Sequence, residues 1–115
     1  MRVFNSTQAA LRAEYGIEIG RWSQYDGVDA LPFQAMWCIV PPASQSVQDC
    51  HPEVELAVVV GGQARMVFDD RVVEVPSGAA VLLEPEERHV IHNDSESEPL
   101  RILSVYWLPD AEVAS

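Results

Sequence analysis

The sequence predicts an all-β domain built from short strands, and three observations lead to this prediction. Sixteen valines favour strands over helices, because β-branched side chains fit well on a pleated sheet. Apolar runs of about four to eight residues recur along the chain, separated by Gly, Pro, Asn and Asp. These turn signals come about every 8–12 residues, which is typical of β-sandwiches and barrels. A chain of 115 residues accommodates one such domain, and we expect residues 1–115 to form it around one core.

The N-terminal segment, residues 1–16, contains the only predicted helix, at residues 6–15. Ser6 or Thr7 can cap its first turn, because their hydroxyl groups accept hydrogen bonds from free backbone N–H groups. Several alanines favour the helix, and Gly16 is a typical residue to end it.

The rest of the chain reads as strands separated by turns. The predicted strands are residues 17–22, 33–40, 54–60, 64–68, 71–75, 79–83, 89–93 and 100–108. The segments expected to be loops or turns are residues 26–32, 43–49, 84–88 and 94–99, together with a hairpin turn at Asp69-Asp70. Residues 109–115 are expected to form a frayed tail.

The charge balance excludes several classes of function. The chain has 18 acidic and 7 basic residues, a net charge of -11, which argues against binding to nucleic acids or to anionic membranes. All the basic residues are arginines. The absence of lysine from the sequence excludes Schiff-base chemistry and the phosphate-binding lysine of P-loop proteins.

Cysteine usage and the N-terminal composition indicate a cytoplasmic protein. The first ten residues are too polar for the apolar region of a signal peptide. The longest uncharged apolar run, residues 56–62, is too short to span a bilayer. We therefore expect Cys38 and Cys50 to be reduced thiols rather than a disulfide.

Candidate metal ligands lie in two segments that are far apart in the sequence. Asp49, His51 and Glu55 have the same parity, so an extended backbone would point all three side chains into one cavity. His89 lies on a later strand, where His92 faces the other way. Two imidazoles and two carboxylates from two strands are a plausible set of ligands for a divalent metal. Without a metal, the histidines would be buried side chains with protein hydrogen-bond partners.

These residues also resemble the first metal-binding motif of cupins, a superfamily of small β-barrels. That motif reads His-x-His, three or four residues, Glu, and then Gly about seven residues on. Here Asp49-x-His51 is followed by Glu55 after three residues and by Gly62 seven residues later.

The second cupin motif is matched as well. It reads Pro-x-Gly, then His eleven residues after the Gly, and Asn four residues further. This chain has Pro76-Ser77-Gly78, then His89 and Asn93 at those spacings, with Pro85 in the turn before the histidine. The resemblance implies a cupin double-stranded β-helix, a jelly-roll-like barrel, with a short N-terminal helix. It also implies a homodimer, because cupins commonly pair through their strands.

Carried over residue by residue, the resemblance gives Asp49, His51, Glu55 and His89 as the metal-ligand positions. Asp49 departs from the motif, which has a histidine there. It either binds the metal through an oxygen atom or orients His51. Zinc is the expected metal, and Fe(II) or Mn(II) would suit the same donors.

Three short strings give a narrower resemblance. Residues 36–42 (MWCIVPP), 49–55 (DCHPEVE) and 106–109 (YWLP) are similar to zinc cupins that accompany methionyl-tRNA-synthetase-like proteins in natural-product pathways. Those cupins belong to hydrazine synthetases. The partner makes an aminoacyl ester of an N-hydroxylated amine, and the cupin promotes rearrangement to an N–N bond. The resemblance implies the same partner and a zinc ion that acts as a Lewis acid.

Two alternatives to this enzyme stay open at the level of sequence. One is an iron or manganese cupin, such as a dioxygenase or an isomerase. The other is a non-catalytic cupin module that binds a small molecule, because one fold hosts many functions. The candidate catalytic residues are Glu55, Cys38 and Arg65. Arg65 and Gln63 would orient a substrate carboxylate, or Arg65 would form a surface salt bridge.

For several other side chains, a structural role is expected ahead of a functional one. We expect the aromatic residues Trp37, Tyr106 and Trp107 to pack in the barrel wall, and enclosure of a substrate is the second interpretation. We expect Glu53 to be solvated at a strand edge. Cys50 alternates with the face of Asp49 and His51 and should not reach the same metal.

Overall fold

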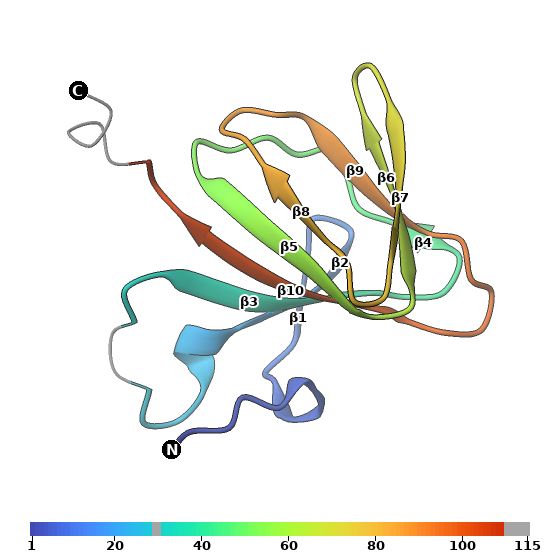
Figure 1. Ribbon diagram of the computed structural model, residues 1–115. Coiled ribbons are helices and arrows are strands. Elements are labelled where there is room, and N and C mark those ends of the chain that lie inside the picture. Colours follow the sequence, from blue (N-terminus) through green and yellow to red (C-terminus); the bar gives the residue numbers. More distant parts are fainter. Residues whose placement is uncertain (29–30, 110–115) are drawn as a thin grey trace.

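Buried and exposed side chains alternate along most strands, and this alternation builds two antiparallel sheets that face each other (Figure 1). The computed structural model describes residues 1–28 and 31–109. Residues 29–30 of the predicted loop and residues 110–115 of the predicted tail lie outside the described part. The described strands confirm the predicted all-β fold.

The larger sheet has six strands in the order β1-β2-β3-β10-β5-β8. Their bounds are Arg12–Glu14 for β1, Ile17–Arg21 for β2, Gln34–Val40 for β3, Leu100–Trp107 for β10, Val54–Gly61 for β5 and Ala80–Leu83 for β8. The smaller sheet has four strands in the order β4-β9-β6-β7. Their bounds are Ser44–Gln45 for β4, His89–Asn93 for β9, Gln63–Phe68 for β6 and Val72–Pro76 for β7. The short strand β4 lies within the segment predicted to be a polar loop.

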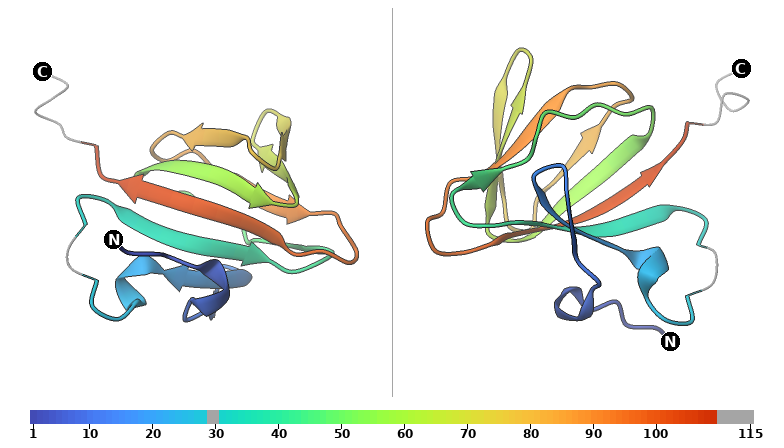
Figure 2. Two further views of the ribbon diagram at one scale, coloured as in Figure 1. Left: turned by 60° about the horizontal axis from the view of Figure 1, so that its bottom comes forward. Right: turned by 180° about the vertical axis from the view of Figure 1, so that it is seen from behind.

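Figure 2 shows the strands of the two sheets from two further sides, and the hydrophobic core is built from buried residues of both sheets. Its buried residues are Ile17, Ile19, Cys38, Val40, Ala57, Val59, Ala64, Met66, Phe68, Val75, Leu83, Ile91, Leu100 and Ile102. Both sheets contribute to this cluster, so burial of apolar surface holds them together.

The predicted N-terminal helix is wrong beyond Gln8. A single 3-10 turn, η1 (Ser6–Gln8), is capped by the Asn5 side chain, and β1 follows it. Tyr15 and Gly16 both have positive φ, 55° and 77°, and join β1 to β2 as a two-residue hairpin loop. Positive φ at both positions is the geometry of a tight hairpin turn. Pairing with β2 therefore overrides the helix propensity of the alanines.

Aromatic rings of Phe4, Trp22 and Tyr25 cover the outer side of β3 at Trp37. Phe4 stacks on Trp22 with ring centroids 4.1 Å apart, and Trp22 contacts Trp37 at 5.5 Å. The indole N–H of Trp37 donates to the Tyr25 hydroxyl at 2.8 Å. Trp22 belongs to the second 3-10 turn, η2 (Trp22–Gln24). Trp37 is therefore a wall residue, as predicted, but it faces away from the cavity.

Both helical turns are three residues long, so no helix within residues 1–28 and 31–109 could cross a bilayer.

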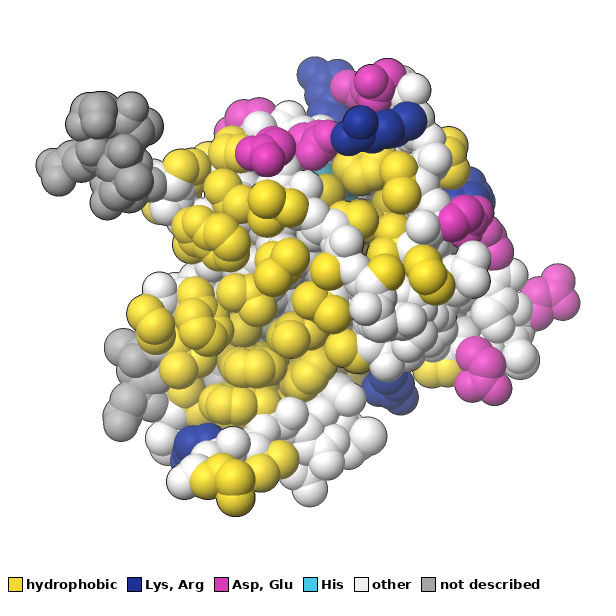
Figure 3. Space-filling model, viewed as in Figure 1, with side chains coloured by type: hydrophobic (Ala, Val, Ile, Leu, Met, Phe, Trp, Pro, Cys, Tyr) yellow, Lys and Arg dark blue, Asp and Glu magenta, His cyan; other side chains and the backbone are white. Residues whose placement is uncertain are grey.

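The six-stranded sheet also presents apolar side chains on its outer side. Hydrophobic side chains gather over β3, β10 and β5 in the space-filling view (Figure 3). The outward positions of β5, β8 and β10 that form this outer apolar face are Leu56, Val58, Val60, Leu82, Leu103, Val105 and Trp107. Val60, Leu82 and Trp107 are among the exposed large hydrophobic residues. Exposed apolar patches are common where proteins bind partners.

Candidate metal centre

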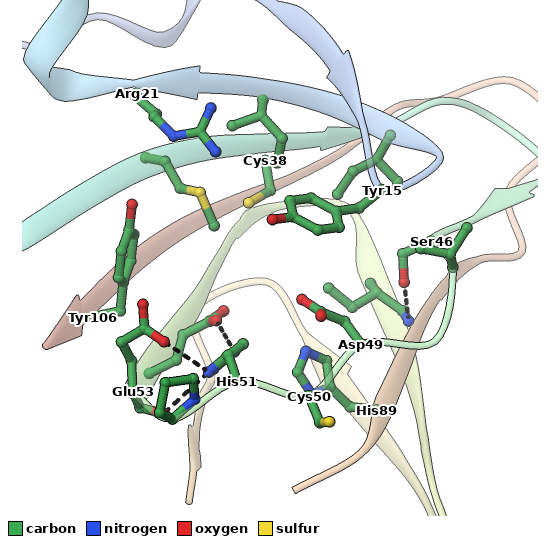
Figure 4. A pocket seen from close by; sticks show the side chains of 17 residues that line it. Tyr15, Arg21, Cys38, Ser46, Asp49, Cys50, His51, Glu53, His89 and Tyr106 are labelled. Atoms are coloured by element: carbon green, nitrogen blue, oxygen red, sulfur yellow. Dashed lines mark hydrogen bonds and ion pairs between the residues drawn. The ribbon is translucent and has the colours of Figure 1, made fainter. Parts of the chain in front are cut away.

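A pocket of about 330 Å3 opens between the two sheets (Figure 4). Strands β2, β3, β5, β9 and β10 and the segment before β5 contribute its lining. Ile19, Met36 and Ile91 form part of an apolar wall. The volume lies at the small end of the range for ligand sites, which suits a small metabolite.

Three of the predicted metal ligands meet at one side of this pocket. One ligand atom from each of Asp49, His51 and His89 lies within 4.8 Å of the other two. A backbone bridge places Asp49 beside His89: Asp49 N–H donates to the His89 carbonyl at 3.1 Å, and His89 N–H donates back at 3.0 Å. The segment before β5 thus pairs with β9, and this pairing brings together residues that are 40 positions apart in the sequence.

Both histidines are held in the same way by the backbone. The Nδ1 atom of His51 lies 3.1 Å from the carbonyl oxygen of Glu53, and the Nδ1 atom of His89 lies 3.0 Å from that of Glu87. A carbonyl oxygen only accepts, so each Nδ1 must carry the proton and donate. In a neutral imidazole, this arrangement leaves Nε2 unprotonated, which is the form that binds a metal.

Glu55 joins the site through His51. Its Oε1 atom lies 3.0 Å from His51 Nε2, and the residue is 6% exposed. Imidazole nitrogen and carboxylate oxygen are both donors to divalent metals, so a metal bound at His51 Nε2 would lie within reach of Glu55. The separation therefore fits a shared metal ion, although Glu55 is not part of the three-residue cluster.

The donor set as a whole fits a divalent metal. Two imidazoles with fixed tautomers and two carboxylates are ligands that Zn(II), Fe(II) and Mn(II) all accept. These donors lie at the boundary between the pocket and the core, with His89 5% exposed. A metal there would remain open to a molecule in the pocket.

The opposite side of the pocket carries Arg21, Cys38 and Tyr15, while Tyr106 extends its hydroxyl towards Arg21 (Figure 4). Burial raises the pKa of the Cys38 thiol, and the nearby Glu55 raises it further. The thiol is therefore protonated, so Cys38 serves as a wall residue rather than as a nucleophile. Burial also raises the pKa of Tyr106, so its hydroxyl stays neutral and can donate a hydrogen bond.

Arg65 lies outside the pocket, so it does not act as a catalytic residue there. It donates two hydrogen bonds to Asp94, at 2.7 and 3.0 Å, and the neighbouring Gln63 donates to Glu74. The register between β6 and β9 explains why Arg65 lies at the surface. Arg65 pairs with His92, and both side chains point outward. The structure therefore supports the surface salt bridge that was the alternative for Arg65.

Glu53 differs from its prediction, because it lines the pocket and is half-buried rather than solvated at an edge. Cys50 is exposed and lies outside the ligand cluster, as predicted. His92 also lies outside both the cluster and the pocket lining.

Asn93, the last residue of the second motif, is buried and holds loops together. Its amide group donates to the carbonyl oxygens of Val40, Pro41 and Glu98 at 3.0, 3.2 and 2.8 Å. Its own Oδ1 accepts from the backbone N–H of Ser95. His89 and Asn93 therefore lie on the same face of β9 with different roles. His89 is a metal-ligand position, and Asn93 connects loops through hydrogen bonds.

Comparison with known proteins decides the family. The family model described as "Cupin domain" matches residues 36–106, which is more than half of the chain. The protein belongs to the cupin family. A Cupin 2 conserved barrel domain protein from Salinispora arenicola is 29% identical, with a TM-score of 0.80 over 97% of this chain and 91% of that one.

Two further cupin-like structures agree on the fold. A protein from Photorhabdus luminescens is 26% identical, with a TM-score of 0.78 over 97% of this chain and 88% of that chain. A predicted oxalate decarboxylase from Thermotoga maritima is 17% identical, with a TM-score of 0.73 over 94% of this chain and all of that one. At that identity the second likeness shows the cupin fold alone.

Arg21 and Tyr15 are pocket residues that the sequence reasoning missed. A signal for Arg21 was present, because it shares parity with Ile17 and Ile19 on a short strand. A charged side chain in line with two apolar core residues is a candidate for a cavity wall. Tyr15 carried no such signal, because its position depends on the hairpin turn that replaced the predicted helix.

Proposed function

We propose that the protein is a metal-dependent cupin enzyme that acts on a small molecule. The observation that carries the proposal is the shared tautomer of His51 and His89, whose Nδ1 atoms both donate to backbone carbonyls. Asp49, His51 and His89 would supply three ligand atoms, and Glu55 the fourth. When bound, the metal would act as a Lewis acid that polarises a substrate oxygen or nitrogen atom.

Metal content provides the first test of this proposal. We expect about one metal ion per chain by elemental mass spectrometry, lost in His51→Ala and in His89→Ala. His92→Ala is the matched control, because His92 lies on the same strand as His89 and outside the pocket lining. This variant should keep its metal.

Each result of the metal analysis separates the candidate functions. Zinc would support the Lewis-acid enzyme. Iron or manganese would favour the dioxygenase or isomerase, which turnover with and without oxygen would then distinguish. A folded protein that takes up no metal after incubation with zinc, iron and manganese would overturn the enzyme proposal and favour a non-catalytic binding module.

The narrower form of the proposal is zinc-dependent N–N bond formation in natural-product biosynthesis, with a methionyl-tRNA-synthetase-like partner. It is supported by the resemblance of residues 36–42, 49–55 and 106–109 to the zinc cupins of hydrazine synthetases. The test supplies such a partner with ATP, an amino acid and an N-hydroxylated amine. We expect a hydrazine by mass spectrometry with wild-type protein, and only the ester with His51→Ala. Ester without hydrazine in both reactions would contradict this narrower form.

We also propose that the cupin is a homodimer that buries the outer apolar face. The outward residues of this face carry no acidic group, so two chains of net charge -11 can meet there without bringing carboxylates together. Sedimentation tests this proposal. Leu103→Asp should shift the protein towards a monomer, and Val72→Asp, on an exposed position of the smaller sheet, should not. A monomeric wild-type protein would contradict the proposal.

A further inference from the structure

The pocket has two chemically unlike sides. One side holds the carboxylates and imidazoles of the candidate metal centre, and the other holds the guanidinium group of Arg21 (Figure 4). Among the described residues that line the pocket, Arg21 is the only Lys or Arg. A cation at the wall of a cavity attracts an anionic group.

Glu14 holds this guanidinium group in place. Arg21 donates from Nη1 to Glu14 Oε2 at 2.5 Å and from Nη2 to Oε1 at 3.0 Å, across the β1–β2 hairpin. Glu14 is not part of the pocket lining, so it binds Arg21 without blocking the cavity. A guanidinium group has five N–H donors, and this pair uses two of them. The remaining donors are available to Tyr106 and to a ligand.

Tyr106 completes this side of the pocket. Its hydroxyl group points towards Arg21, and its side chain lies on the inward side of β10 (Figure 4). Ile19, Met36 and Cys38 add apolar surface to the same pocket. A ligand that fits this arrangement has an acceptor group at one end, a short aliphatic middle and a metal-binding group at the other end.

We propose that Arg21, together with the Tyr106 hydroxyl, binds the carboxylate of a small substrate whose other end reaches the metal centre. This inference rests on the proposed metal-dependent function. A planar carboxylate matches the fork of guanidinium N–H groups. A phosphate dianion suits the site less well, because Asp49, Glu53 and Glu55 also line the pocket and would repel its second charge.

Calorimetry with simple probes tests the carboxylate site. Malonate, succinate and glutarate span a range of lengths, and their mono-amides replace one carboxylate by a neutral group of the same shape. We expect one of these dicarboxylates to bind the zinc-loaded wild-type protein at least about tenfold more tightly than its mono-amide. Arg21→Gln should abolish this preference, and Arg21→Lys should restore part of it, because the charge remains while the fork is lost.

Arg65→Gln is the matched control, because Arg65 also donates two hydrogen bonds to one carboxylate but lies outside the pocket lining. It should keep the wild-type preference. Every variant is checked for zinc content and for its circular dichroism spectrum. A folded, zinc-containing Arg21→Gln protein that retains the full preference for the dicarboxylate would overturn the inference, as would a wild-type protein with no such preference.

Failure of the metal proposal is distinguishable from failure of this one. If the wild-type protein holds no metal, butyrate is titrated into it in place of the dicarboxylates. Butyrate binding that is lost in Arg21→Gln and kept in Arg65→Gln would support the carboxylate site while the metal proposal fails. Equal butyrate binding by all three proteins would overturn the carboxylate site as well.

Discussion

The Nε2 atom of His51 lies 3.0 Å from Oε1 of Glu55, while Nδ1 of the same ring lies 3.1 Å from the carbonyl oxygen of Glu53. The carbonyl cannot donate, so Nδ1 carries a proton. Because an unprotonated nitrogen and a carboxylate are both acceptors, this contact is satisfied either by a metal that the two atoms share or, in the metal-free protein, by a proton between them. A metal that binds at Nε2 would take the place of that proton.

Metal binding should accordingly release about one proton per metal ion from this pair. Zinc titrations in buffers of different ionisation enthalpy measure the release. In Glu55→Gln the amide group can donate to Nε2 directly, so the release should fall by about one proton and the affinity by about 10–100-fold. The same proton release in both proteins would show that the contact between His51 and Glu55 holds no displaceable proton.

The two motif glycines both have positive φ, but only Gly62 is also crowded by neighbouring backbone atoms. Alanine substitutions should separate backbone strain from this crowding. Gly62 and Gly78 have nearly equal φ angles, 86° and 89°. A Cβ atom at Gly62 would lie 3.2 Å from the carbonyl oxygen of Pro99, whereas one at Gly78 meets nothing within 4 Å. Gly78→Ala should cost about 1 kcal/mol from backbone strain alone.

Gly62→Ala should cost at least about 1 kcal/mol more than Gly78→Ala, because backbone atoms cannot move aside as a flexible side chain can. Urea denaturation of both variants measures the difference. Equal losses of unfolding free energy in the two variants would mean that the backbone at Pro99 moves away from the new methyl group without a cost in stability.

Asn93 should matter for stability rather than for metal binding. Asn93→Ala removes the side-chain donor from three carbonyl groups, one of them on the fully buried Val40, and we expect a loss of about 2–3 kcal/mol of unfolding free energy. Asn5→Ala is the control, because Asn5 is exposed and caps only η1, and it should cost less than about 1 kcal/mol. The folded Asn93→Ala protein should keep its metal, and loss of the metal would indicate that Asn93 also positions His89.

Much of the fold was predictable because each strand carries its own signal. The β-branched run in residues 54–60 and the pair Asp69-Asp70 are local, so β5 and the β6–β7 hairpin followed from the sequence. The gathering of Asp49, His51 and His89 also followed, because motif spacing and strand parity agree. Because successive side chains of a strand point to opposite faces, their directions can be predicted once the strands are known.

The N-terminal segment shows where local reasoning fails. Residues 9–15 have good helix propensity, but Arg12–Glu14 gains backbone hydrogen bonds by pairing with β2. That choice depends on a turn at Tyr15 and on the partner strand, which propensity does not include. The error hid Arg21 as well, because the Glu14 side chain that holds Arg21 was assigned to a helix.

The ion pair between Glu14 and Arg21 gives a pH dependence with a definite sign. The hydrogen bonds from Arg21 lower the pKa of the Glu14 carboxyl below its ordinary value of 4.5. A carboxyl whose folded-state pKa is lowered contributes stability that is present above the unfolded-state pKa and is lost as the pH falls through the folded-state value. The stability difference between wild type and Glu14→Gln should therefore be constant near neutral pH and shrink below pH 4.5.

Urea denaturation of both proteins across this range measures the difference, which should be small because exposed ion pairs are well solvated. Asp94→Asn is the matched control, since Arg65 lowers the pKa of Asp94 in the same way at the surface. Both substitutions should show the same acid dependence, but only Glu14→Gln should also weaken carboxylate binding, because only Glu14 holds a pocket residue. Equal carboxylate binding by the two variants would mean that Arg21 keeps its place in the pocket without Glu14.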